Sequence, residues 1–282
     1  MQTIFIVGAG TMGSGIAQVA AQSGFSVRLF DIAAQQLERA RATISGNLDR
    51  LVKKEKLTAA DRDATLARIE TVTQLDGVAA ADLVIEAASE NEALKLELFA
   101  KLDALAKPEA ILASNTSSIS ITKIAAATKN PERVIGMHFF NPVPVMALVE
   151  LIRGLQTSDE TYQKAEAIAK ALGKTPVAVR NSPGFVVNRL LCPMINEAIF
   201  ALQEGLASAE GIDEAMKLGC NHPIGPLALA DLIGLDVELA VMQVLYEGFK
   251  DPKFRPAPLL VEMVEAGKLG RKTGEGFYRY DK

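Results

Sequence analysis

Two residues of this chain, His138 and Glu150, carry an imidazole and a carboxylate that could act together in proton transfer. The segment around them reads as an apolar strand, a proline-containing turn and a second apolar strand, with both residues at equal distances from Pro144. If it folds back as an antiparallel pair, the two residues lie opposite each other with Cβ atoms about 5 Å apart. The carboxylate would then hold the imidazole tautomer and stabilise the imidazolium. The alternative is a structural histidine beside an unrelated glutamate.

A second chemical signal is the spacing G-x-G-x-x-G formed by Gly8, Gly10 and Gly13, directly after the apolar run Ile4–Val7. The first glycine permits a tight turn, the second lets a pyrophosphate approach the backbone, and the third lets helix and strand pack closely. The helix that follows would offer its free N–H groups and positive dipole end to phosphates. Such a turn can also exist for packing alone.

The acidic residue that completes this dinucleotide signature is Asp31, which ends a second apolar strand over Phe25–Phe30. A carboxylate there can accept hydrogen bonds from a ribose 2′-hydroxyl and would repel a 2′-phosphate. The pattern therefore predicts NAD(H) as cofactor rather than NADP(H). Arg28 is the nearby cation that leaves NADP(H) open.

Further polar side chains follow two predicted strands at the edge where a Rossmann fold binds its cofactor. Glu90 and Lys95 lie near the start of a helix that a capping box over residues 89–92 predicts, and that helix should run to about Ala106. The segment Ser114–Ser118 follows another strand and suits a catalytic loop. Plain helix charges and an ordinary helix cap are the alternatives.

The chain also predicts a helical arm, with one helix over residues 33–56, a turn at 57–59, and a second helix through Ile69. Its middle is basic and carries Arg50, Lys53, Lys54 and Lys56. A solvated basic face and an anion-binding patch for a substrate polyphosphate explain this cluster about equally well.

The elements that must position these residues indicate an α/β fold: a Rossmann-type doubly wound sheet with a helical arm, followed by an all-α C-terminal domain. The predicted domains are residues 1–182 and 183–282. The second domain should contain helices over residues 186–203, 209–218, 227–246 and 259–266, and its tail could fold back onto the first domain. The helix over 227–246 is apolar over most of its surface, which predicts a homodimer interface.

Composition narrows the class of protein further. The 282 residues are 49% hydrophobic, enough for two cores, and the net charge of −4 argues against a nucleic-acid partner. No apolar stretch is long enough to span a membrane, and a first strand starting at residue 3 or 4 leaves no room for a targeting peptide. Cys192 and Cys220 lack metal-ligand spacing, so we expect no metal and a reducing, cytoplasmic location.

Five motifs in order resemble the 3-hydroxyacyl-CoA dehydrogenase family over essentially the whole chain. They are the segments 8–13 (GAGTMG), 114–118 (SNTSS), 138–142 (HFFNP), 183–189 (PGFVVNR) and 270–278 (GRKTGEGFY). The length looks most like the stand-alone bacterial 3-hydroxybutyryl-CoA dehydrogenases. The resemblance implies NAD-dependent interconversion of (S)-3-hydroxyacyl-CoA, such as 3-hydroxybutyryl-CoA, and 3-oxoacyl-CoA, such as acetoacetyl-CoA.

The resemblance also implies residue roles. His138 matches the general base and Glu150 its orienting partner, while Ser117 and Asn188 match residues that hydrogen-bond the reacting substrate. Coenzyme A contacts match Lys54 and, less closely, Asn47, where some relatives have serine. Arg50 joins them as a candidate substrate contact because it belongs to the basic cluster of the arm. Cofactor contacts match the glycine loop with Thr11 and Met12, together with Asp31, Glu90, Lys95, Asn115, Ser117, Asn141 and Lys272.

Other functions remain open at this point. Longer or dicarboxylic acyl chains would use the same residues, so the chain length preferred is not predicted. The β-hydroxyacid dehydrogenases, which act on free acids, share the cofactor fold but typically rely on a lysine in the helical domain. A dinucleotide-binding protein without catalysis would keep the glycines without needing His138 or Glu150.

Overall fold

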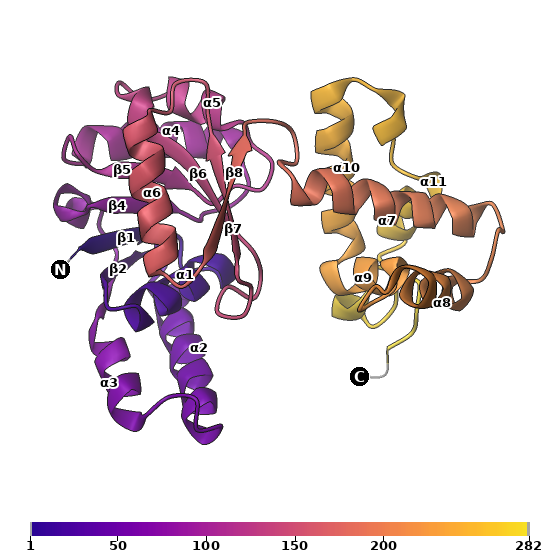
Figure 1. Ribbon diagram of the computed structural model, residues 1–282, viewed down its shortest axis with the longest axis horizontal. Coiled ribbons are helices and arrows are strands. Elements are labelled where there is room, and N and C mark those ends of the chain that lie inside the picture. The colour runs from indigo at the N-terminus through magenta and orange to yellow at the C-terminus, as the bar shows by residue number, and fades with distance from the viewer. Residues whose placement is uncertain (1, 281–282) are drawn as a thin grey trace. The chain divides into compact units, whose positions relative to one another are not determined.

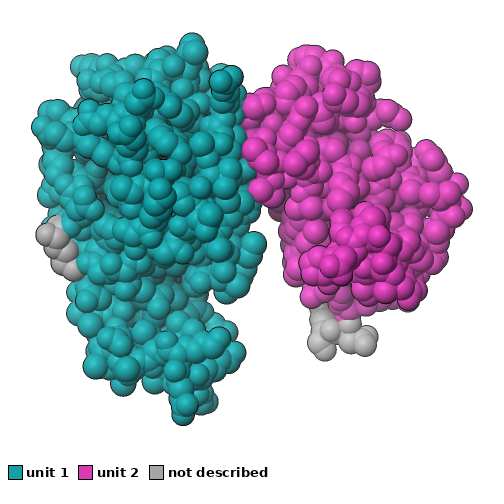
Figure 2. Space-filling model, viewed as in Figure 1, with its two compact units in different colours: residues 1–181 teal, residues 182–282 magenta. Residues whose placement is uncertain are grey.

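The computed structural model describes residues 2–280 and divides the chain into two compact units, residues 1–181 and 182–282 (Figure 2). The boundary predicted from the sequence lies one residue further along the chain. Each unit has its own buried apolar core. Over the described residues, no helix is both long and apolar enough to cross a membrane.

The first unit is built on an eight-stranded sheet with the order β3-β2-β1-β4-β5-β6-β7-β8 (Figure 1). Neighbouring strands from β3 to β6 are parallel, β7 is antiparallel to β6, and β8 is parallel to β7. This confirms the predicted Rossmann-type α/β class. The strands are β1 (Thr3–Val7), β2 (Ser26–Phe30), β3 (Ile69–Val72), β4 (Leu83–Glu86), β5 (Ile111–Ser114), β6 (Val134–Phe139), β7 (Leu148–Arg153) and β8 (Thr175–Arg180).

The register of the sheet puts the ends of its central strands in one row. Val7 of β1 is paired with Phe30 of β2 and with Glu86 of β4, and Glu86 is paired in turn with Ser114 of β5. The loops after these strands therefore start side by side, at the edge where open α/β sheets bind ligands. The polar side chains of Glu86 and Ser114 lie at this edge.

Helices cover the two faces of the sheet (Figure 1). Strand residues alternate between the faces, so Ile4 and Ile6 of β1 share one apolar cluster with Ile16, Leu37 and Ile168 from three of the helices. The helices of this unit are α1 (Thr11–Gln22), α2 (Ala34–Lys53), α3 (Ala59–Ala67), α4 (Glu92–Leu105), α5 (Ile121–Ala126) and α6 (Asp159–Ala171), with short 3-10 turns η1 (Asp76–Ala80) and η2 (Pro131–Arg133).

The predicted arm is present as α2 and α3, which extend beyond the sheet (Figure 1). The prediction that its second helix reaches Ile69 is wrong. Ile69 instead begins β3, which pairs with β2 at the edge of the sheet. A strand of four residues is too short to show a period of its own, so helix propensity in the preceding segment obscured it.

The second unit is helical, as predicted, and its first helix is central. The helix α7 (Val187–Gln203) contacts each of α8 (Ala209–Cys220), α9 (Pro226–Ile233), α10 (Leu235–Phe249) and α11 (Pro258–Glu265). The prediction of one helix over 227–246 is wrong, because α9 ends at Ile233 and Gly234 separates it from α10. That glycine has a φ of 104°, a conformation that the interior of a helix does not allow.

The described part of the C-terminal tail folds onto α9 through Asp231, a buried residue. Its carboxylate accepts hydrogen bonds from the amides of Phe277 and Tyr278, both at 2.9 Å, and from the hydroxyl of Tyr280. Two short 3-10 turns, η3 (Pro252–Phe254) and η4 (Arg271–Thr273), complete this unit. The hydrogen bonds of Asp231 thus anchor the tail within the second unit.

Candidate active site

The predicted antiparallel pair around Pro144 is present, and it brings His138 and Glu150 together. The register of β6 and β7 places them directly opposite each other. Nδ1 of His138 lies 2.7 Å from Oε2 of Glu150, and both side chains are buried. A carboxylate in this place can orient an imidazole by accepting a hydrogen bond from its Nδ1, so the contact fits an acid–base pair.

The two loops on either side of the strand β6 support this pair. The amide of Phe139 donates to Oδ1 of Asn115 at 2.9 Å, so the end of β6 is tied to the segment after β5. On the other side, the buried Nζ of Lys174 donates to the carbonyls of Val143 and Met146 in the turn between β6 and β7. Nothing in the sequence pattern pointed to Lys174, which is a lone lysine next to a strand.

The glycine loop has the geometry that its spacing predicts. Gly8 has a φ of 104°, and a Cβ at Gly13 would lie 1.8 Å from the carbonyl oxygen of Gly8. A Cβ at Gly10 would meet no atom within 4 Å, so the backbone here faces open space. In the described structure no side chain caps α1, which leaves its first amides available, including those of Thr11 and Met12. The loop therefore fits a pyrophosphate group.

Asp31, the predicted ribose contact, also holds the glycine loop. Its Oδ2 accepts a hydrogen bond from the amide of Ala9 at 2.9 Å, and its Oδ1 accepts one from Ala33 at 3.0 Å. Beside it lies a largely apolar cavity of about 380 Å³, with Ile32 and Leu94 among its lining residues. Such a cavity suits the adenosine half of a dinucleotide.

Arg28, the cation that left NADP(H) open, is engaged elsewhere. Its Nε lies 2.9 Å from Oε2 of Glu70 on the neighbouring strand β3. It is also three residues before Asp31, about 10 Å along the strand. The structure thus removes the main objection to NAD(H).

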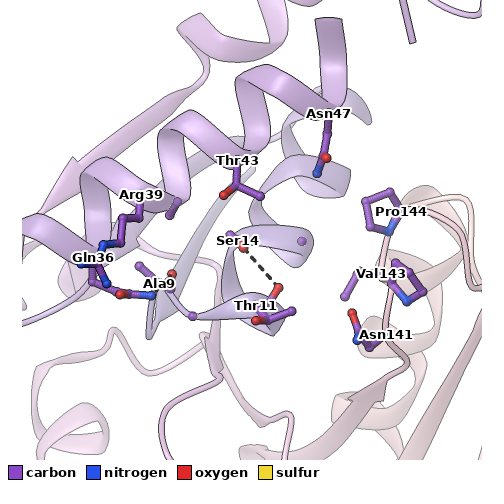
Figure 3. Close-up of a pocket in the computed structure, with 14 residues that line it drawn as sticks. Ala9, Thr11, Ser14, Gln36, Arg39, Thr43, Asn47, Asn141, Val143 and Pro144 are labelled. Atoms are coloured by element: carbon purple, nitrogen blue, oxygen red, sulfur yellow. Dashed lines mark hydrogen bonds between the residues drawn. The ribbon is translucent and has the colours of Figure 1, made fainter. Parts of the chain in front are cut away.

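A second cavity, of about 240 Å³, lies between the glycine loop, α2 and the turn after β6 (Figure 3). It brings together Gly10 and Thr11 with Asn141, all three predicted cofactor contacts. Asn47, a predicted coenzyme A contact, lies at the far end of the same cavity (Figure 3). The two sets of predicted contacts therefore meet in one hollow of the first unit.

The amide of Asn47 is occupied by the protein itself. Its Nδ2 donates to Oε1 of the buried Gln18 at 3.0 Å, and its Oδ1 accepts a hydrogen bond from Arg50. The neighbouring lysines differ, since within residues 2–280 no ion pair involves Lys53, Lys54 or Lys56, and all three are exposed. Unpaired lysines on an exposed arm are available to an anionic ligand.

Glu90 organises the loop that carries Ser117. Its Oε1 accepts hydrogen bonds from the amide of Ser117 at 3.0 Å and from the hydroxyls of Thr116 and Ser118. Burial would raise the pKa of Glu90, but the Lys95 ammonium and these hydrogen bonds outweigh it and hold that pKa below its usual range. Glu90 is therefore a carboxylate at neutral pH.

The predicted capping box at residues 89–92 is wrong in detail. Asn91 is the residue that caps α4, and its Oδ1 accepts a hydrogen bond from the amide of Leu94 at 2.9 Å. Asparagine caps a helix as well as serine does, so the sequence alone could not rank the two. The outcome leaves Glu90 free to face the Ser117 loop.

Sequence reasoning missed Glu86. This glutamate is the last residue of β4 and is fully buried, where it pairs with Lys95 and accepts a hydrogen bond from Ser114. The available signal was an acidic residue ending an otherwise apolar strand. Buried carboxylates are costly, so such a residue needs a reason.

The remaining predicted residues, Asn188 and Lys272, belong to the second unit. Asn188 lies in the first turn of α7 and is half-buried. Lys272 lies in η4, where its Nζ forms an ion pair with Asp236 at the start of α10. Within the second unit, Asn188 and Lys272 thus lie on two different elements.

Models of known families match both units. Residues 3–182 match the NAD binding domain of 3-hydroxyacyl-CoA dehydrogenase, and residues 184–280 match the C-terminal domain of the same enzyme. The two matches together span nearly all of the described chain.

Individual proteins of known sequence or structure are similar to nearly the whole chain. The chain is 55% identical over 280 residues to a 3-hydroxybutyryl-CoA dehydrogenase from Bradyrhizobium diazoefficiens, covering 99% of this chain and 96% of the relative. It is 48% identical to a 3-hydroxyadipyl-CoA dehydrogenase from Escherichia coli, covering 99% of this chain and 59% of that one. A solved (S)-3-hydroxybutyryl-CoA dehydrogenase from Ralstonia eutropha has a TM-score of 0.98 at 63% identity, with 100% of each chain covered.

Proposed function

This chain belongs to the 3-hydroxyacyl-CoA dehydrogenase family, and from that premise we propose that it interconverts (S)-3-hydroxybutyryl-CoA and acetoacetyl-CoA. Its first unit is an NAD-binding domain. The names of the relatives support the four-carbon substrate. The observation that carries the proposal is the buried contact of 2.7 Å between His138 and Glu150 at the ligand-binding edge of the sheet.

The residues of the first unit fit the cofactor. The uncapped start of α1 and the open space at Gly10 would hold the pyrophosphate, and Asp31 would hold the adenosine ribose. When bound, NAD⁺ supplies the hydride acceptor for C3 of the substrate. The protein's part is to orient the substrate and to manage the proton.

His138 acts as general acid and base in this proposal. In the oxidising direction its Nε2 takes the proton of the C3 hydroxyl, because an alcohol that is losing hydride becomes strongly acidic. Glu150 keeps Nδ1 protonated and stabilises the imidazolium that results. In the reducing direction the imidazolium returns the proton to the C3 oxygen.

Ser117 and Asn188 position the substrate. Ser117 would hydrogen-bond the C3 oxygen and Asn188 the thioester end, with Lys54 and Arg50 of the arm on the phosphates of coenzyme A.

The homodimer and the cytoplasmic location belong to the same proposal. Exposed Leu232 and Val237 on α9 and α10 support the dimer, and light scattering at micromolar concentration should give the mass of two chains. A monomer mass would contradict that part.

A dicarboxylic substrate is the second candidate, because the Escherichia coli relative is named for 3-hydroxyadipyl-CoA. The test is NADH oxidation with 3-oxoacyl-CoA thioesters of increasing length and with 3-oxoadipyl-CoA. We expect the highest kcat/KM with acetoacetyl-CoA and no turnover of free acetoacetate. A preference for 3-oxoadipyl-CoA would favour the second candidate, and turnover of the free acid alone would overturn both.

A further inference from the structure

The fully buried Glu86 joins three segments of the first unit. Its Oε1 accepts a hydrogen bond from the amide of Ala88 at 2.7 Å and forms an ion pair with Lys95 of α4. Its Oε2 accepts a hydrogen bond from the hydroxyl of Ser114 at 2.7 Å. The carboxylate thus ties β4 to the start of the loop that follows it, to α4, and to the end of β5.

Both oxygens lead to the segment that contains Ser117. On one route, Lys95 lies 3.4 Å from Oε2 of Glu90, whose Oε1 accepts hydrogen bonds from Ser117. On the other route, the hydroxyl of Ser114 accepts a hydrogen bond from the amide of Thr116 at 3.2 Å. The segment 115–118 is therefore held from two sides by one carboxylate.

The position of Glu86 is costly for stability, which makes its contacts informative. Both Glu86 and Lys95 are almost completely withdrawn from solvent, and such pairs often stabilise a fold no better than apolar residues would. Catalysis, in contrast, depends strongly on small displacements of the groups that orient a substrate. A rigid link from β4 to Ser117 serves the second purpose.

We propose that Glu86 is a positioning residue that holds segment 115–118, and with it Ser117, in the conformation that meets the reacting substrate. This rests on the role of Ser117 in the proposed function. Glu86 itself touches neither substrate nor cofactor in this proposal. It acts through Lys95, Glu90 and Ser114.

The test replaces Glu86 with glutamine and measures two quantities. The first is the hydrogen-exchange rate of the amides in segment 115–118, measured by mass spectrometry on the protein without ligands, which shows how firmly the segment is held. The second is kcat for acetoacetyl-CoA, which shows whether a looser segment slows catalysis. We expect faster exchange in this segment and a kcat lowered about 10- to 100-fold, with a smaller change in KM.

A matched control lies on α4, the helix that carries Lys95. Asp103 is also buried and paired with an arginine, Arg133, with Nη2 and Oδ1 2.8 Å apart, but its other contacts go to Lys129 and Asn130 rather than to segment 115–118. Asp103→Asn should lower the unfolding temperature while leaving kcat and the exchange of segment 115–118 unchanged. An equal loss of kcat in Asp103→Asn would show that any buried ion pair has this effect, and would overturn the proposal.

Ser114→Ala is a smaller perturbation of the same contacts, and it replaces Glu86→Gln in the test if that variant does not fold. It removes the route through Oε2 alone, so we expect the same two changes at smaller size. Unchanged exchange in segment 115–118, or an unchanged kcat where Ser117→Ala lowers it, would overturn the proposal. If Ser117→Ala itself leaves kcat unchanged, the proposed function loses Ser117, and the exchange rates alone decide whether Glu86 holds the loop.

Discussion

At the scale of single residues, the chemistry of this chain depends on carboxylates with three different surroundings. Glu150 is buried against an imidazole, Glu86 is buried against an ammonium, and Asp31 accepts two backbone amides near the surface. We propose that the first orients a base, the second holds a loop, and the third selects NAD(H) over NADP(H). Their roles follow from their partners rather than from their residue type.

Asp31 gives the first prediction. Because its carboxylate would lie against a 2′-phosphate, kcat/KM should be far higher with NADH than with NADPH, and Asp31→Ser should shrink this ratio about tenfold or more. Glu38→Gln, on the exposed side of α2, is a control for a general change of charge. Equal kcat/KM for the two cofactors in the parent enzyme would refute the assignment.

Sequence reasoning reached some of these residues and missed others, for physical reasons. Asp31 and the glycines follow one another on neighbouring elements, so local spacing identifies them. The pairing of His138 with Glu150 followed from a turn between two strands. Glu86 and Ser114 lie far apart in the chain and meet only through the register of β4 and β5. No local pattern encodes that contact.

At the level of elements, the helix α2 of the arm has a buried side and an exposed side. Its buried residues Leu37, Ile44 and Leu48 attach α2 to the core, while its basic residues face outward. The helices were predictable because apolar residues recur at helical spacing. The end of the arm was not, since β3 exists only through its pairing with β2.

The second prediction concerns the lysines of this arm. If Lys54 binds the phosphates of coenzyme A, Lys54→Met should raise the KM for acetoacetyl-CoA several-fold, with kcat nearly unchanged, because it removes uniform binding. Added salt should have the same effect on the parent enzyme, since exposed charges are screened over about 10 Å at 0.1 M. Lys217→Gln, an exposed lysine on α8, is the control and should change neither constant.

A truncated substrate separates the two explanations of the basic cluster. The N-acetylcysteamine thioester lacks the phosphates, so its KM should not respond to Lys54→Met or to salt. If it responds as fully as the coenzyme A ester does, the cluster is a solvated face and not a binding patch.

In the whole molecule, each unit has its own core and its own buried acidic residue. In the second unit the carboxylate of Glu238 is fully buried on α10, and no N–H or O–H group of the described chain donates to it. The thiol of Cys192 is its polar neighbour, and burial raises the pKa of Glu238 to about 8. The burial of Glu238 could not be predicted from the sequence, where α10 has the pattern of an apolar helix.

This raised pKa predicts how stability depends on pH. Above its unfolded pKa near 4.5, the folded state holds a proton that the unfolded state releases, so stability falls as pH rises and the loss is complete above about 8. The full loss is at most about 5 kcal/mol. Between pH 5 and 9 the unfolding temperature of the parent should therefore fall more steeply than that of Glu238→Gln.

The control for this measurement is Glu204→Gln, an exposed glutamate at the end of α7. The unfolding temperature of Glu204→Gln should change with pH in the same way as that of the parent. If Glu238→Gln also follows the parent, Glu238 does not carry a raised pKa in the folded protein.

A double-mutant cycle on kcat/KM for acetoacetyl-CoA shows whether His138 and Glu150 form one acid–base unit. His138→Gln should lower this constant about 10²- to 10⁴-fold, the usual contribution of a general acid–base group. Glu150→Gln alone should lower it while preserving the fold and NADH binding, and adding it to His138→Gln should cost little more, because the two act together. Fully additive losses would show that the two residues act independently, and a near-normal rate for His138→Gln would show that His138 is not the base.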